Sequence, residues 1–252
     1  VPATDLETSG AVIDSQGVEQ LLGSDKIRYL SEVMNFPGVL RGDPAVIRKI
    51  EAAKRHSKAI DGHAPGLRGE DLRRYAGAGI TTDHESSTRE EALEKIAVGM
   101  KVQIREGSAA KNFDEIVPIL SDHSESCMFC SYYKHPDELL KGHINEMARR
   151  ALEYGVDPMK VLRVACVNPV LHYGLPVGLL RPGDPADLIT VDNLEDLHVI
   201  ATYIDGKMVA DGGETLMPRT PSRAVNRFDA ETKSPSDLSV PGRRGRINAI
   251  EV

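Results

Sequence analysis

The chain has 252 residues, of which 40% are hydrophobic and 27% charged, a composition typical of a soluble globular protein with one large domain or a medium and a small one. Its formal net charge of −7, with no basic stripe ahead of the C-terminal tail, excludes a nucleic-acid-binding surface. It contains neither an apolar run of about 18 residues nor a signal-peptide pattern, so we expect no membrane association and a cytoplasmic location.

Short apolar runs alternate with helix-like segments through the first 135 residues. The apolar runs end in turn residues and therefore predict strands, at residues 27–34, 59–63, 80–84, 101–107 and 126–131. The segments around them predict helices at residues 18–22, 45–56, 70–78, 87–100 and 112–120. Alternation of this kind predicts an α/β fold with a parallel sheet and helices outside it.

Five strand–helix units are visible, whereas a closed (β/α)₈ barrel needs about eight. The sheet is therefore either open or completed by units that precede Val1. The chain has no initiator Met, which favours the second interpretation, an internal piece of a longer protein.

Local signals define several boundaries. Residues 35–38, Asn-Phe-Pro-Gly, have the composition of a turn. Asp43-Pro44 is typical of a helix N-cap followed by Pro at the first helical position, and the run from Ser87 resembles a capping box.

The second half of the chain changes character after Gly174. Before it, the sequence predicts a long helix at 137–154 and another at 157–166, capped by Asp157-Pro158. After it come a strand ending at Val191 and a hairpin at 199–210 with an Asp-Gly turn. We therefore divide the chain into an α/β domain, residues 1–173, and a small β region with an irregular tail, residues 174–252, whose last run (246–252) predicts a strand.

Three metal-binding side chains stand at three successive predicted strand ends: Glu32, His63 and His84. In an α/β barrel the carboxyl ends of the strands face one side, so these side chains can share one site. Imidazole nitrogen and carboxylate oxygen both bind divalent ions, and one carboxylate can bridge two of them. The alternative is that each histidine is a hydrogen-bonded structural residue.

Glu85 follows His84 directly. Beyond a strand end the strict alternation of side chains lapses, so Glu85 can reach the same site as a proton carrier. The alternative is that it supports a ligand from behind or caps a helix.

A second pattern suggests zinc. His123-Ser-Glu125 followed by Cys127-Met-Phe-Cys130 resembles the zinc-dependent nucleobase deaminases, which use H-x-E and then P-C-x-x-C. Here no Pro precedes Cys127, and one residue separates it from Glu125, which leaves no room for the intervening strand and helix. The run favours a buried strand with cysteine as a small apolar filler.

Three further polar residues and one glycine-rich stretch are also compatible with purely structural roles. Arg105 and Glu106 end a predicted strand and can form an ion pair, either solvated or supporting a ligand. His143 opens a helical segment, where capping, packing and ligand contact are all compatible with its position. The glycines of residues 62–69 do not form the G-x-G-x-x-G dinucleotide fingerprint.

At these residues the chain resembles the adenine deaminase family of bacteria and archaea, within the amidohydrolase superfamily. The matching stretches are Val1-Pro-Ala-Thr, Glu7-Thr-Ser-Gly10, Glu32-Val-Met-Asn-Phe-Pro-Gly-Val39, Asp61-Gly-His-Ala-Pro-Gly66, Asp83-His-Glu85, Ser87-Thr-Arg-Glu-Glu-Ala-Leu93, Ile104-Arg-Glu-Gly-Ser-Ala-Ala-Lys-Asn112, Gly142-His-Ile144 and Pro185-Ala-Asp-Leu188. Pro-Ala-Asp-Leu is common to many amidohydrolases. Met-Asn-Phe-Pro-Gly-Val and Arg-Glu-Gly-Ser are much more specific to adenine deaminases.

The resemblance implies a metal-dependent (β/α)₈ TIM barrel, whose later strands lie in residues 1–173, and a small β-sandwich, part of which lies in residues 174–252. It implies hydrolytic deamination of adenine to hypoxanthine and ammonia in purine salvage, with a divalent metal pair, manganese or iron rather than zinc. Glu32 matches the bridging carboxylate, and His63 and His84 match histidine ligands. His84 and Glu85 are the implied catalytic residues. The implied partner is a small-molecule purine, in a homo-oligomer, and no purine-contacting residue is identified.

Two departures from the family matter. The His-x-His pair of the family's first strand is absent from this chain. In addition, Ser131-Tyr132-Tyr133 stands where the family has Thr-Asp-Asp, so Tyr132 replaces the aspartate that binds metal and takes a proton from water. A phenol with a pKa near 10 is a poor base. Losing the aspartate as a general base typically lowers the rate by a factor of about 10²–10⁴.

We therefore expect an adenine deaminase whose activity is impaired in this chain. One alternative is a catalytically inactive amidohydrolase-like binding or assembly subunit. The other is a cyclic amidohydrolase that acts on a different substrate, such as a dihydroorotate-like ring.

Overall fold

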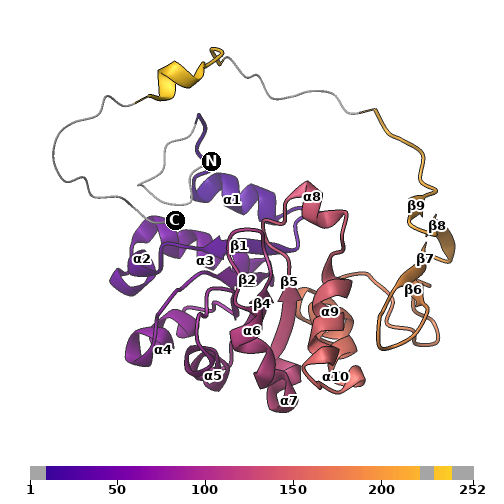
Figure 1. Ribbon diagram of the computed structural model, residues 1–252. Helices are drawn as coiled ribbons and strands as arrows, with labels where there is room; N and C mark the ends of the chain where they lie inside the picture. Colours follow the sequence, from indigo (N-terminus) through magenta and orange to yellow (C-terminus); the bar gives the residue numbers. More distant parts are fainter. Residues whose placement is uncertain (1–9, 222–229, 240–252) are drawn as a thin grey trace, which may run out of the picture. The chain divides into compact units, whose positions relative to one another are not determined.

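The computed structural model describes residues 10–221 and 230–239 (Figure 1). The chain divides into a large unit, residues 1–216, and a short second unit, residues 217–252. The described residues of the second unit contain one 3₁₀ turn, η4 (Pro235–Leu238). None of the helices in the described ranges has both the length and the hydrophobicity of a membrane span.

Five parallel strands follow one another in sequence order. They are β1 (Tyr29–Val33), β2 (Ala59–Gly62), β3 (Thr82–Asp83), β4 (Lys101–Arg105) and β5 (Cys127–Cys130). Strand β1 pairs with β2, and β4 lies between β3 and β5. The amide of Thr81 donates to the Ile60 carbonyl at 2.8 Å and links the two ladders. The prediction of an α/β fold with parallel strands is confirmed.

Helices precede the first strand and occupy the segments between the strands (Figure 1). They are α1 (Ser15–Leu22), α3 (Pro44–Arg55), α4 (Gly69–Gly77), α5 (Arg89–Ala97), α6 (Phe113–Ile116), η1 (Val117–Ile119), α7 (Leu120–His123) and η2 (Ser124–Ser126). Asp43 caps α3 as predicted, because its carboxylate accepts from the Ala45 amide at 2.8 Å. The cap of α5 is Thr88, one residue after the predicted start at Ser87.

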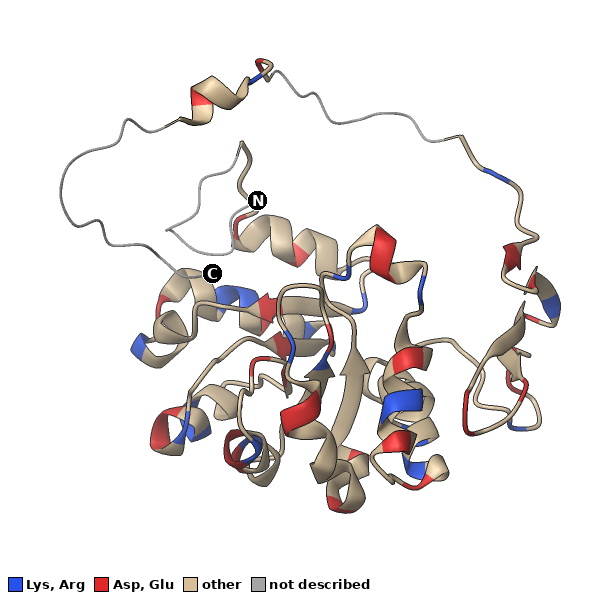
Figure 2. Ribbon diagram, viewed as in Figure 1, with Lys and Arg blue, Asp and Glu red and all other residues tan. Residues whose placement is uncertain are grey.

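Charged residues of both signs are interleaved along the outer helices α4 and α5 (Figure 2). Several are paired one turn apart, as Arg73 is with Glu70 at 3.0 Å. Exposed pairs of this kind contribute little to stability, so the helices depend on their apolar faces for packing.

Residues 35–38 do not form the predicted turn. They begin a short helix, α2 (Phe36–Arg41), which Asn35 caps by accepting from the Gly38 amide at 2.9 Å. Pro37 lies in the first helical turn, where a missing amide hydrogen costs nothing. Asn, Pro and Gly are common both in turns and at the start of a helix, and here they start a helix.

The prediction of one long helix at 137–154 is also wrong. Two helices occupy this stretch, α8 (Pro136–Leu139) and α9 (Ile144–Glu153). Between them Gly142 has a φ of +153°, a backbone conformation that residues with a side chain rarely adopt. Its carbonyl accepts a hydrogen bond from Lys134 Nζ at 2.8 Å. The glycine therefore breaks the helix.

The helix predicted at 157–166 continues further, to Tyr173. It consists of α10 (Pro158–Leu162), a π-helical turn η3 (Arg163–Val167) and α11 (Asn168–Tyr173). Pro169 lacks an amide hydrogen and its ring would clash with the carbonyl four residues earlier, and the wider π turn ahead of it relieves this conflict. Asp157 caps α10 as predicted.

The β region is a four-stranded antiparallel sheet in sequence order. Its strands are β6 (Leu188–Val191), β7 (Val199–Ile204), β8 (Lys207–Asp211) and β9 (Glu214–Thr215). The predicted hairpin is confirmed, and Asp205 and Gly206 both have positive φ, as a two-residue hairpin turn requires. The predicted strand at 246–252 lies outside the described residues, and the division at residue 173 stays a prediction.

Two apolar clusters pack behind the parallel strands. One combines residues of α3, β2, α4 and their neighbours, including Ile50, Ile60 and Leu72. The other joins β4 and β5 to the later helices, including Ile104 and Phe113. Both rest on aliphatic side chains, as expected for a chain with 4% aromatic residues. The apolar clusters pack the strands against the helices, and the polar residues lie at the carboxyl ends of the strands.

Gly62 marks the closest approach of β2 and β3. A Cβ at this position would lie 2.3 Å from the Thr82 carbonyl oxygen and 2.8 Å from Ile80 Cγ2. Both neighbours are held by the sheet, so neither can move away cheaply.

We predict that Gly62→Ala lowers the free energy of unfolding by about 1–3 kcal/mol, the usual cost of overpacking. The matched control is Gly77→Ala at the end of α4, where nothing lies within 4 Å of the added methyl group. That change should be neutral or stabilise by up to about 1 kcal/mol. Urea denaturation followed by circular dichroism measures both, and equal effects would contradict the prediction.

Candidate metal centre

The three predicted metal ligands meet at the carboxyl ends of adjacent strands. Glu32 lies near the end of β1, and His63 and His84 directly follow β2 and β3. Their donor atoms all lie within 4.8 Å of one another. The sequence therefore predicted which residues converge, and their role as metal ligands stays a prediction.

One oxygen of Glu32 faces both histidines. Oε2 lies 2.9 Å from His84 Nε2 and 3.3 Å from His63 Nδ1, and the two imidazole rings are 5.3 Å apart. His84 Nε2 is buried, and its geometry toward Glu32 is not that of a hydrogen bond; among the described residues it has no hydrogen-bond partner. An unsatisfied buried nitrogen is costly. Two imidazole nitrogens and a carboxylate oxygen around one point fit a divalent cation.

The charges of this cluster follow from its burial and its partners. Burial raises the pKa of the Glu32 carboxyl, but His63, His84 and Tyr132 outweigh this and hold it well below its usual range. Burial lowers the pKa of His84, but the carboxylates of Glu32 and Glu85 outweigh this and raise it to about 9. A proton and a divalent cation on the same nitrogen of His84 exclude each other, because a metal-binding imidazole must be deprotonated.

Glu85 lies beside both histidines. Its Oε1 is 3.3 Å from His84 Nε2 and 3.5 Å from His63 Nδ1. The buried guanidinium of Arg105 donates to both carboxylate oxygens. Burial raises the pKa of the Glu85 carboxyl, but His84 and Arg105 lower it to about 2. Glu85 is therefore ionised at neutral pH, and its low pKa makes it a weak base.

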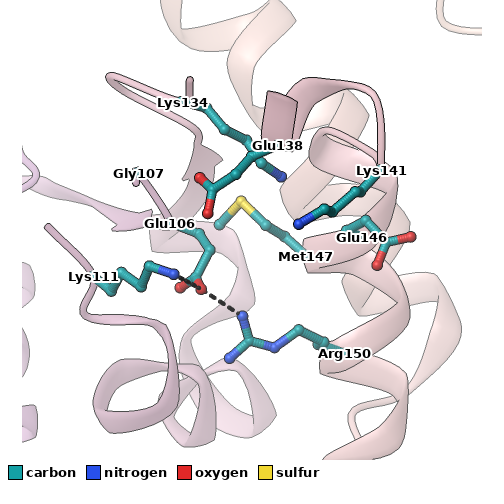
Figure 3. A pocket seen from close by; sticks show the side chains of 9 residues that line it. All are labelled: Glu106, Gly107, Lys111, Lys134, Glu138, Lys141, Glu146, Met147 and Arg150. Atoms are coloured by element: carbon teal, nitrogen blue, oxygen red, sulfur yellow. Dashed lines mark ion pairs between the residues drawn. The ribbon is translucent and has the colours of Figure 1, made fainter. Parts of the chain in front are cut away.

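Arg105 and Glu106 do not pair with each other. Arg105 turns to Glu85, whereas Glu106 contacts Arg150 at 2.7 Å and Lys111 at 3.8 Å, in a separate pocket of about 180 Å³ (Figure 3). Successive residues of a strand end point to different sides, so each finds its own partner.

Tyr132 enters the cluster from the end of β5. Its hydroxyl donates to Glu32 Oε1 at 2.8 Å, and its ring lies 4.9 Å from the His84 ring. Its φ of +44° is rare for a residue with a side chain. Burial, together with the Glu32 carboxylate, raises the pKa of its phenol. Tyr132 is therefore a hydrogen-bond donor at this site.

A cavity of about 450 Å³ adjoins the cluster. Its lining includes Tyr29, Glu32, Asp61, His84, Gln103, Phe129, Tyr132, Ile144 and Tyr173. At its wall the Tyr173 hydroxyl donates to Asp61 at 2.9 Å and accepts from Gln103 Nε2 at 2.5 Å. Aromatic walls with a few fixed polar groups suit a small planar ligand.

Several of these residues escape the sequence analysis. Gln103 interrupts an apolar strand, a signal that could have marked it as facing a polar site. Tyr173 carries no such signal, because it meets Asp61 from 112 residues away. Lys95, discussed below, has the pattern of an exposed helix residue although it is fully buried.

The cysteine pattern does not join this cluster. Cys127 and Cys130 lie within β5, and burial raises the pKa of both thiols to about 12. His123 ends α7, ahead of β5 and so at the opposite end of that strand from Tyr132. His143 Nε2 lies 2.8 Å from Ser131 Oγ at the rim of the cavity.

The sequence matches the amidohydrolase family over residues 7–209. Among curated proteins, an adenine deaminase of Salinibacter ruber is 54% identical over 250 residues, 99% of this chain and 46% of its own length. An adenine deaminase of Methanosarcina mazei is 50% identical over 248 residues, 98% of this chain and 45% of its own length. The chain spans about half the length of the curated relatives it matches.

Solved structures share the fold at low identity. N-acetyl-D-glucosamine-6-phosphate deacetylase of Mycobacterium smegmatis superposes with a TM-score of 0.61 at 18% identity, over 82% of this chain and 64% of that one. A β-aspartyl dipeptidase of Fervidobacterium islandicum AW-1 gives a TM-score of 0.60 at 14% identity, over 81% and 63%. At such identities the likeness concerns the fold alone.

Tyr75 ties together the strand ends that carry the cluster. Its hydroxyl, on helix α4, donates to the Val33 carbonyl at 2.8 Å and accepts from the His63 amide at 3.0 Å. The side chain is fully buried. Removing the hydroxyl leaves a donor and an acceptor without a partner.

We predict that Tyr75→Phe lowers the free energy of unfolding by about 1–3 kcal/mol, the cost of unsatisfied buried groups. The matched control is Tyr154→Phe, whose hydroxyl donates to Asp114 Oδ1 at the surface. That change should stay within about 0.5 kcal/mol. Urea denaturation measures both, and a Tyr75→Phe effect as small as the control would show that the bridge is dispensable.

Proposed function

The chain belongs to the amidohydrolase family, and we propose that it is the metal-bearing part of an adenine deaminase, which hydrolyses adenine to hypoxanthine and ammonia. The observation that carries this proposal is the convergence of Glu32, His63 and His84 within 4.8 Å, in a sequence about half identical to proteins named adenine deaminase. The proposal includes a purine as the small-molecule ligand, a homo-oligomeric state and a cytoplasmic location.

The proposed architecture is a partial (β/α)₈ barrel joined to part of a β-sandwich. Five parallel strands in sequence order support the barrel, because consecutive βα units of a barrel pair in this way. The antiparallel sheet β6–β9 supports the sandwich. The superposition on the deacetylase and dipeptidase structures agrees with both.

Glu32, His63 and His84 would hold the metal. Their mixed nitrogen and oxygen donors suit manganese, iron or zinc, and the resemblance to adenine deaminases favours manganese or iron, which is part of the proposal. When bound, a divalent ion supplies Lewis-acid chemistry, which makes water nucleophilic at neutral pH. The family pattern adds a second ion bridged by Glu32, and this pair is part of the proposal.

Glu85 is the proposed proton carrier. His84 and Arg105 lower the pKa of its carboxyl to about 2, so Oε1 is ionised and can take a proton from the attacking water only as a weak base. The same oxygen lies 3.3 Å from His84 Nε2, at the edge of the proposed site, and can return the proton to the departing amino nitrogen. The purine ring would occupy the cavity of about 450 Å³.

Tyr132 limits this chemistry. Its hydroxyl donates to Glu32 Oε1, so the oxygen that would bridge a second ion is already hydrogen-bonded. The phenol is also a poor proton acceptor, because its pKa is raised further above the ordinary value. We therefore propose that activity is impaired in this chain.

The same observation favours a second candidate, a catalytically inactive amidohydrolase-like subunit that binds or assembles. A chain that keeps the histidines but blocks the bridging oxygen retains the fold and one metal position without full catalysis. Metal binding without turnover of adenine or of a panel of cyclic amides would favour this candidate; turnover of a cyclic amide alone would indicate a different substrate.

We predict that the chain binds Mn²⁺ and that Glu32→Gln weakens this binding by more than about 100-fold, beyond the usual effect of losing a residue that only supports a ligand. The amide keeps the shape but removes the charge. Glu51→Gln, an exposed change on α3, is the matched control and should bind as the unaltered chain does. Isothermal titration calorimetry and metal analysis measure both; an unaltered chain that retains no manganese, iron or zinc would refute the proposed site.

We also predict that Tyr132→Asp restores deamination in a chain extended with the segments of the Salinibacter ruber relative that this chain lacks. The expected gain in ammonia release from adenine is about 10²–10⁴-fold, because a carboxylate base returns to the site. Tyr132→Asn is the matched control, because the amide has the shape of the aspartate without its charge and should leave the activity at background. Background activity in the metal-loaded Tyr132→Asp variant would mean that the tyrosine is not what silences the site.

A further inference from the structure

Lys95 is a lysine with no exposed surface. It lies on α5, and its ammonium group donates to the Ala64 carbonyl at 2.9 Å, Asp83 Oδ2 at 2.7 Å and Glu91 Oε1 at 2.7 Å. These three acceptors use all three of its donors. Lysine is almost never fully buried unless it is paired in this way.

Two of its partners flank the metal cluster. Ala64 follows His63 and Asp83 precedes His84 in the chain. Asp83 Oδ1 also accepts from the Ala64 amide at 2.9 Å, so both polar groups of Ala64 are held. Lys95, Asp83 and Ala64 therefore form a closed ring of contacts between the loop after β2 and the loop after β3.

The remaining acceptors extend the same link. Asp83 Oδ2 accepts from the Glu85 amide at 2.9 Å and so also fixes the residue after His84. Glu91 Oε1 accepts from the Gly66 amide at 2.8 Å, and its Oε2 accepts from the Ser87 amide at 3.1 Å. The two histidine loops are thus joined at two points, and Lys95 contacts both carboxylates that join them.

Burying this network costs free energy, because charged groups lose their contact with water. It buries two carboxylates and one ammonium, with exposed side-chain fractions of 0% for Lys95 and Asp83 and 4% for Glu91. Apolar side chains of similar volume often replace such networks without loss of stability. They cannot, however, fix the two loops through directional hydrogen bonds.

We propose that Lys95 is a positioning residue, which locks the two histidine-bearing loops together and so presets His63 and His84 for a shared ion. The link between the loops stands on the geometry of this chain alone, and only its consequence for metal binding rests on the proposed function. The excess of one negative charge in the network also favours a cation nearby.

The test compares Lys95→Met, the double variant Lys95→Met/Glu91→Gln and the control Lys54→Met. Methionine keeps the length of the side chain without the charge. The double variant removes one of the two buried carboxylates that Lys95→Met leaves without a positive counter-charge, so it keeps the test usable if Lys95→Met alone does not fold. Lys54 makes an exposed pair one turn away on α3 and serves as the matched lysine.

Two measurements are made on each full chain. The first is amide hydrogen exchange of residues 61–66 and 82–88 in the metal-free protein, with the rest of the chain as an internal reference. The second is the affinity for Mn²⁺ by isothermal titration calorimetry. We expect faster exchange confined to these loops and Mn²⁺ binding weakened by about 10–100-fold in both Lys95 variants, and no change in Lys54→Met.

Recovery of stability separates positioning from folding. The double variant should regain stability relative to Lys95→Met, yet keep the fast exchange and the weak Mn²⁺ binding. A stable double variant with unaltered loop protection and Mn²⁺ affinity would overturn the inference. An unaltered chain that does not bind Mn²⁺ would refute the proposed metal site instead, and the exchange rates alone would then decide whether Lys95 holds the loops.

Discussion

The ionised carboxylate of Glu32 is the constraint around which the strand ends are arranged. A partly buried carboxylate is stable only when donors replace the water that it has lost. Its donors are His63 after β2 and Tyr132 after β5, which lie far apart in the sequence, and the His84 imidazole after β3 lies 2.9 Å from the oxygen that faces His63. Each donor reaches Glu32 only if its strand is in register beside its neighbours. Assembly of the parallel strands and completion of the site are therefore one event.

Side chains engage both carboxylate oxygens of Glu32. The histidines cover one oxygen and Tyr132 covers the other. An aspartate at position 132 would repel Glu32 unless a cation lay between them, whereas a tyrosine donates a hydrogen bond without any cation. Tyr132 therefore satisfies Glu32 Oε1 with a neutral hydrogen-bond donor.

Sequence periodicity could predict the strands and their order because each short apolar run ends in turn residues. It could predict the convergence of Glu32, His63 and His84 because parallel strands end on one side. It could not predict Lys95, since Glu91 and Lys95 are four residues apart and look like an exposed helix pair. The break at Gly142 and the contact between Tyr173 and Asp61 depend on tertiary packing, which no local pattern records.

The run Asp61-Gly-His-Ala-Pro-Gly66 looks like a metal motif, yet most of it builds the scaffold. Asp61 accepts hydrogen bonds from Thr82 and Tyr173, and Gly62 allows two strands to approach. Ala64 and Gly66 supply the backbone groups that the buried carboxylates and Lys95 bind. Among these residues only His63 belongs to the proposed ligand set.

Most residues of this motif therefore hold the loops in place, and few of them belong to the proposed ligand set. Among the described residues, Asp83, Glu91 and Lys95 form no hydrogen bond with Tyr132, so a change at the end of β5 leaves their hydrogen bonds intact. That separation explains physically how the chain can keep its histidine loops in order whichever side chain stands at position 132.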